Sequence, residues 1–113
     1  MRHSEDFRRA TRRGVRASSP SIVVYAGSAP SGSGVRVGFI VGRQVGNSVT
    51  RNRVKRRLRH LAARRLPSSP PDVDLVIRAL PQAGVAGDDL VTDLDRAWLR
   101  ATDRVTSQSV VAR

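Results

Sequence analysis

Hydrophobic residues at every second position predict the strands of this chain. Val35, Val37, Phe39 and Val41 give residues 35–41 one continuous apolar face, as expected for a strand packed on one side. Shorter runs rich in β-branched, aromatic or small apolar side chains predict further strands at 15–18, 22–25 and 73–79.

Apolar residues three and four positions apart predict helices around these strands. Val54, Leu58 and Leu61 form one stripe along residues 48–65, and most of the remaining circumference is polar or charged. The same spacing predicts a helix at 89–106. A serine cap followed by acidic residues, with Gly14 as a stop, predicts a short helix at 5–13.

The order of the predicted elements indicates the fold class. It runs helix, three strands, helix, strand, helix, which is typical of an α+β sandwich with one small sheet packed against helices. A chain of 113 residues has room for a single domain. We therefore assign residues 1–106 to one α+β domain and residues 107–113 to a flexible C-terminal tail.

Positive charge is concentrated in the first part of the chain. Its 21 Lys and Arg residues outnumber 9 Asp and Glu residues, for a net charge of +12. Residues 1–66 carry 16 basic and 2 acidic side chains, whereas residues 67–113 carry 5 and 7. This asymmetry predicts a polyanion-binding surface on an otherwise ordinary domain.

The predicted helix at 48–65 carries the strongest local signal. Eight cations lie between residues 51 and 65, with no acidic residue among them. Like charges four residues apart repel on a helix, and solvated helix faces normally mix both signs. The run therefore favours a nucleic-acid partner over a merely solvated face. Asn52 lies at a helical position, where asparagine is unfavourable, and this favours a role for its side chain in a specific hydrogen bond to RNA.

Few residues fit catalysis or metal binding. The chain has no cysteine, which excludes thiolate zinc sites and cysteine nucleophiles and fits a reducing compartment. His60 lies among arginines, with no nearby carboxylate in sequence to orient it as a base. The pairs Asp72/Asp74 and Asp88/Asp89 are explained by the start of a strand and of a helix. We predict no catalytic residue, no protein-bound metal and, since no apolar run is long enough to span a membrane, a cytoplasmic protein.

Two stretches of the sequence resemble one bacterial protein family. The sequence VRVG at 35–38 and the sequence VGNSVTRNRVKRRLR at 45–59 closely resemble the bacterial ribonuclease P protein subunit. The triplet Arg-Asn-Arg at 51–53 is the most specific motif of that family. The resemblance covers nearly the whole chain; it is strong over 35–61 and weak after residue 80.

The resemblance implies a role in removing the 5′ leader from precursor tRNA. In this family the RNA subunit is the ribozyme and holds the Mg²⁺ ions, whereas the protein binds that RNA and the leader. It is thus a non-catalytic subunit of an endoribonuclease. The family fold also implies a left-handed crossover around the central basic helix, where the residue pattern alone predicts the usual right-handed one.

The resemblance further assigns roles to individual residues. Phe7, Tyr25 and Arg43 match positions that line the leader-binding cleft, although the two aromatic residues also fit a hydrophobic core. Thr11 stands where the family often has a second aromatic residue, which removes one stacking surface. The positions that match the surface facing the catalytic RNA and the cleft edge are Arg51, Asn52, Arg53, Lys55, Arg56 and Arg59.

Two other functions fit a small basic α+β domain. One is a small ribosomal or general RNA-binding protein without processing activity, which reconstitution with the catalytic RNA and precursor tRNA would distinguish. The other is a DNA-binding regulator that inserts its basic helix into a major groove. The basic helix is flanked by strands instead of a paired helix, which argues against the regulator.

Overall fold

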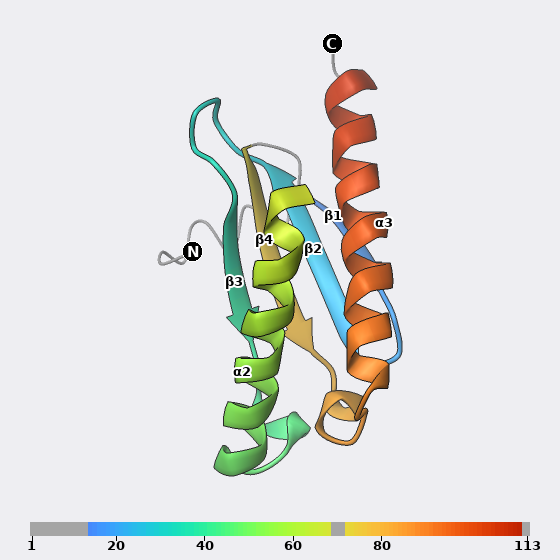
Figure 1. Ribbon diagram of the computed structural model, residues 1–113. Coiled ribbons are helices and arrows are strands. Elements are labelled where there is room, and N and C mark those ends of the chain that lie inside the picture. Colours follow the sequence, from blue (N-terminus) through green and yellow to red (C-terminus); the bar gives the residue numbers. More distant parts are fainter. Residues whose placement is uncertain (1–13, 69–71, 112–113) are drawn as a thin grey trace.

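The computed structural model of this chain describes residues 14–68 and 72–111. Over these residues it contains a four-stranded sheet, two α-helices and three short 3-10 helices (Figure 1). The strands are β1 (Val15–Ser18), β2 (Ile22–Ser28), β3 (Arg36–Ile40) and β4 (Val73–Ala79); the α-helices are α2 (Ser48–Arg65) and α3 (Asp89–Val111); the 3-10 helices are η1 (Arg43–Val45), η2 (Leu66–Ser68) and η3 (Pro81–Gly84).

The sheet has the strand order β1-β2-β4-β3. β2 pairs antiparallel with β1 and β4, whereas β3 pairs parallel with β4. In Figure 1, β3 and β4 both run downward, α2 connects them in front of the sheet, and β4 lies to the right of β3. The β3–α2–β4 crossover is therefore left-handed, which confirms the expectation from the resemblance and not the right-handed default.

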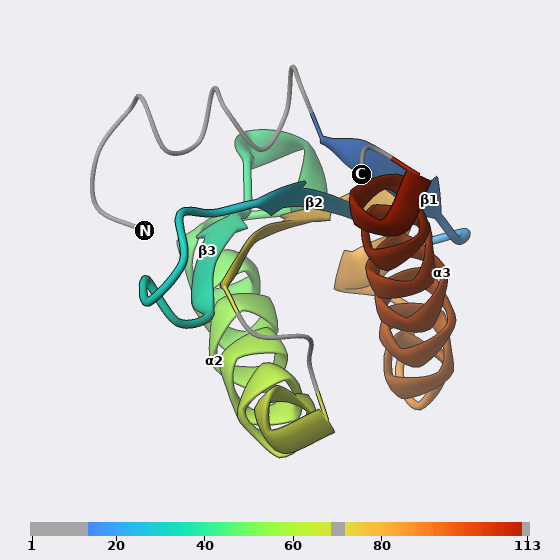
Figure 2. The same ribbon diagram turned by 90° about the horizontal axis from the view of Figure 1, so that it is seen from above.

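Both α-helices pack on the same face of the sheet (Figure 2). Alternate residues of the strands, such as Val24 on β2 and Leu75 on β4, are fully buried between the sheet and the helices. Trp98 of α3 is 2% exposed in the same core. Each large aliphatic side chain buried here contributes about 1.5–3 kcal/mol, which makes this layer the main source of stability.

The predicted elements agree closely with those observed, apart from the bounds of β2 and β3 and the end of the last helix. The α+β class, the strands at 15–18 and 73–79 and the helix at 48–65 are confirmed. β2 extends to Ser28 because its whole length pairs with β4. The predicted end of the last helix at 106 is wrong: α3 continues to Val111, so residues 107–111 of the predicted tail are helical.

The error at the end of α3 has a sequence cause. The apolar spacing that predicted the helix ends at Val105, but no glycine or proline follows it in 107–111 to stop the helix. The predicted helix at 5–13 lies outside the described residues.

Helix α2 begins directly after Asn47, whose side chain caps its first turn. The Asn47 side chain accepts a hydrogen bond from the Thr50 backbone N–H at 2.9 Å, satisfying one of the amides that the first turn leaves free. Val54, Leu58 and Ala62 are buried, and Leu61, predicted in the core, is half-buried at the edge of that stripe. Ala62 is buried in place of Leu61, because residues four positions apart, such as Leu58 and Ala62, lie on the same side of a helix.

A close backbone contact fixes the start of α2 against the rest of the domain. A Cβ atom at Gly84 in η3 would collide with the carbonyl oxygen of Val45 in η1. Glycine at this position therefore allows η3 to lie directly on η1, two residues before the cap of α2.

Candidate nucleic-acid interface

The six residues predicted to face RNA all lie on α2, away from its buried stripe. No acidic residue occurs anywhere in α2. The residues Asn52, Arg53, Lys55, Arg56 and Arg59 are exposed, and Arg51 is half-buried. We call this set, with Arg51, the α2 surface.

Two other arginines of α2 are already engaged within the domain. Arg57 donates a hydrogen bond to the carbonyl oxygen of Gly87 at 2.8 Å. Arg65 forms an ion pair with Asp95 of α3, with 2.7 Å between Nη2 and Oδ2, and the hydrogen bond to this carboxylate raises the pKa of Arg65. These contacts tie α2 to α3 and the segment before it.

The exposed cations of the α2 surface differ from these tethered arginines. Among the described residues, Arg53, Lys55, Arg56 and Arg59 have neither an ion pair nor a side-chain hydrogen bond. Their mutual repulsion is therefore not relieved within this part of the chain, and a bound polyanion would relieve it.

Arg51 occupies a more enclosed position in the α2 surface. Its Nη2 donates to the Ser48 hydroxyl at 3.1 Å, but its Nε is buried and finds no acceptor in the described part of the chain. A buried N–H without an acceptor is costly in a folded protein. Arg51, Asn52 and Lys55 line one polar hollow of about 350 Å³ with Val41 and Ser48.

The face of the sheet turned away from α2 and α3, called here the second face, carries Tyr25. Tyr25 is half-buried and is not part of the hydrophobic core between the sheet and the helices. It lies beside Arg16 of β1 and Val76 of β4 in strand register, and Gly38 of β3 follows next to Val76. This placement disfavours the core alternative for Tyr25.

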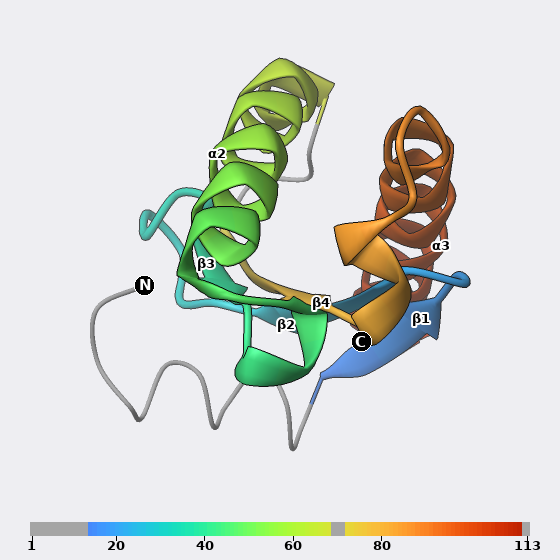
Figure 3. The same cartoon turned by 90° about the horizontal axis from the view of Figure 1, so that it is seen from below.

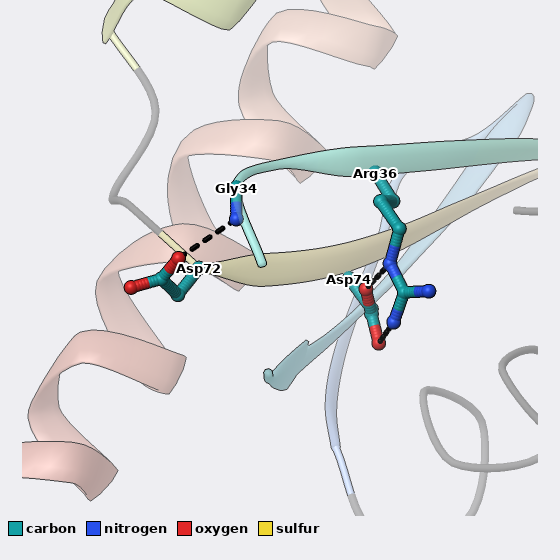
Figure 4. Close-up of polar contacts among 4 residues, drawn as sticks. All are labelled: Gly34, Arg36, Asp72 and Asp74. Carbon is teal, nitrogen blue, oxygen red and sulfur yellow. Dashed lines mark hydrogen bonds and ion pairs between the residues drawn. The ribbon is translucent and has the colours of Figure 1, made fainter. Parts of the chain in front are cut away.

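Arg36 is held on the second face by a buried carboxylate (Figure 4). Its Nε and Nη2 donate to the two oxygens of Asp74 at 2.8 and 3.0 Å, and Asp74 is fully buried. The nearby Asp72 accepts a hydrogen bond from the backbone N–H of Gly34 at 2.8 Å. Each member of this acid pair thus has a structural partner, as its position around a strand start led us to expect.

Arg43 lies on the same side of the sheet as Tyr25. Figure 3 shows η1, which contains Arg43, on the side away from α2 and α3, and the side chain of Arg43 is exposed. The third predicted cleft residue, Phe7, and the altered position Thr11 lie outside the described residues.

Three arginines on the second face were not predicted from the sequence: Arg16, Arg36 and Arg78. Each alternates with core residues of its own strand and lies on the same face as Tyr25. Arg78 is a cation in the mostly apolar run at 73–79, which was the available signal. Their grouping depends on the pairing of strands that lie far apart in sequence, which periodicity cannot provide.

Comparison with known proteins identifies a family over most of the chain. The family model described as Ribonuclease P matches residues 1–102. The Ribonuclease P protein component of Nocardioides sp. is 47% identical over 109 residues, covering 94% of this chain and 93% of the relative. That of Acidothermus cellulolyticus is 43% identical over 110 residues, covering 96% and 92%.

Solved structures share the fold at lower sequence identity. The RNase P protein of Staphylococcus aureus superposes with a TM-score of 0.76 at 23% identity, covering 86% of this chain and 89% of that one. The RNase P protein of Thermotoga maritima gives a TM-score of 0.75 at 22% identity, covering 88% and 94%. Within the described residues, no helix has the length and apolar character needed to cross a membrane.

Proposed function

This chain belongs to the ribonuclease P protein family, and on that premise we propose that it binds the catalytic RNA through the α2 surface and the precursor-tRNA leader through the second face. It is a protein component of a ribonucleoprotein tRNA-processing enzyme. Family membership favours this function over the ribosomal and DNA-binding alternatives.

The exposed cations of α2 are the observation that carries the first half of this proposal. They lie on a helix that carries no acidic residue, and four of them have no partner among the described residues. Each phosphate bound by such a cation releases condensed counterions, which supplies much of the affinity for RNA. Arg51 is half-buried and lines the polar hollow, where its guanidinium adds donors for an RNA oxygen.

We assign catalysis to the RNA subunit in this proposal. The Mg²⁺ ions that activate the attacking water are held by the RNA, and the protein contributes binding energy. The residues of this chain hold the RNA and the substrate in position, and we place this assembly in the cytoplasm.

Tyr25 is the proposed stacking residue for the leader. A half-buried aromatic ring beside Arg16, with Arg78 on the same face of the sheet, provides both a surface for a base and cations for the adjoining phosphates. Arg43, on η1, lies on the same side of the sheet and extends this basic environment.

We expect Tyr25→Ala to weaken precursor-tRNA binding by the assembled holoenzyme while mature tRNA binding stays nearly unchanged. Loss of one stacked base corresponds to about 1–3 kcal/mol. Fluorescence titration of both tRNAs measures the difference, and Tyr25→Phe, which keeps the ring, is the matched control. Equal losses for both ligands, or a folding defect by circular dichroism, would count against a leader contact.

A further inference from the structure

A second hollow on α2 has a different chemical character from the polar one. It is a groove of about 580 Å³, and its described lining residues all belong to α2. Val49 and Leu61 lie near its two ends, about 18 Å apart at 1.5 Å per residue. Arg53 and Arg56 line it between them. The groove therefore combines apolar contacts with cations along three turns of helix.

Val49 is the feature of this groove that the folded domain does not explain. It is 74% exposed in the first turn of a helix whose other outward positions are almost all polar or charged. It contributes nothing to the hydrophobic core. Covering this aliphatic side chain with an apolar group is favourable, because it removes apolar surface from water. If that group also carries a negative charge, it can pair with the neighbouring arginines, which have no ion-pair partner among the described residues.

We propose that this groove binds the unstacked bases of a single-stranded RNA segment, an inference that rests on the proposed function of α2 in RNA binding. Each nucleotide offers an apolar base face for Val49 and Leu61 and a phosphate for Arg53 and Arg56. A double helix keeps its base faces stacked inside and presents mainly phosphates, so it uses the cations but not the apolar contacts. Asn52 lines both this groove and the polar hollow, where its amide can bind the edge of a base.

The apolar contacts and the charge contacts affect the salt dependence of RNA affinity differently, so they can be measured separately. Phosphate binding sets the dependence of affinity on salt, whereas contact with a base face does not change the number of counterions released. Val49→Ala removes apolar surface and no charge. It leaves the fold intact, because Val49 is exposed and alanine favours the helix.

The test uses oligoadenylate RNA and an abasic oligomer of the same length and charge, measured across a salt series. All proteins carry Tyr25→Ala, so that the second face contributes little. We expect Val49→Ala to weaken oligoadenylate binding roughly threefold to tenfold with an unchanged salt slope, and to leave abasic binding unaffected. Val85→Ala, at a site 81% exposed and outside this groove, is the matched control and leaves both affinities unchanged.

Each of the other outcomes shows whether the groove proposal alone is wrong or the proposed function of α2 is wrong as well. Unchanged oligoadenylate affinity in Val49→Ala, with reduced affinity in Arg56→Gln, would overturn the groove proposal and leave the proposed function standing. No effect from either substitution would show that α2 does not bind RNA, so both would fail. An oligoglutamate peptide that binds as tightly as oligoadenylate and is equally sensitive to Val49→Ala would assign the groove to a protein partner and overturn the proposal.

Discussion

The double substitution Arg56→Gln/Arg59→Gln is expected to weaken binding to the catalytic RNA about 10- to 30-fold at 0.15 M salt. Both side chains are exposed, lie off the buried stripe of α2 and have no ion-pair partner among the described residues. Two lost phosphate contacts flatten the log–log salt dependence by roughly one to two units. Filter binding across a salt series measures affinity and slope together.

The matched control for this prediction lies on the other helix. Arg96→Gln/Arg100→Gln removes the same charge from exposed positions of α3. We expect it to change affinity and slope far less, because these residues are outside the α2 surface. Equal effects from the two double variants would mean that only net charge matters, and wild-type binding by the α2 variant would refute the assignment of this surface.

Arg36→Met is expected to destabilise the domain by about 2–4 kcal/mol, because it leaves the buried carboxylate of Asp74 without its partner. The expected loss of stability is somewhat smaller than for a fully buried ion pair, because 34% of the Arg36 side chain is accessible to solvent. For a domain of this size the loss lowers Tm by roughly 10–20 °C, measurable by thermal unfolding followed by circular dichroism.

A second variant separates the buried charge from the packing around it. Arg36→Met/Asp74→Leu removes both charges, and we expect it to recover most of the lost stability, because an apolar replacement needs no partner. If Arg36→Met melts at the wild-type temperature, the ion pair does not stabilise the fold. If the double variant is no better than the single one, the stranded carboxylate is not the cause of the loss.

Local features of the sequence were sufficient to predict the α2 element and its charge. The stripe through Val54 and Leu58 repeats without interruption, and Asn47 provides a side-chain acceptor at the start. The cations of α2 all lie at positions off the buried stripe, so the helical period alone places them on the outward sides of the helix. The end of α3 was mispredicted because nothing in the sequence marks where that helix stops.

Features that depend on contacts distant in sequence could not be predicted from the residue pattern. The position of β3 beside β4 was not predicted, and the hand of the crossover between them came from the resemblance and not from periodicity. The pairing of Arg36 with Asp74, 38 residues away, requires the strand register. The same holds for the arginines around Tyr25, which come from three different strands.

The central claim is that this protein promotes tRNA processing by binding RNA and not by catalysis. Reconstitution of the catalytic RNA, precursor tRNA and this protein at low Mg²⁺ tests it most directly. We expect no cleavage with protein alone, slow cleavage with RNA alone and strong stimulation when both are present. Cleavage of precursor tRNA by RNA-free, nuclease-clean protein, or the absence of any stimulation of the RNA, would contradict the account.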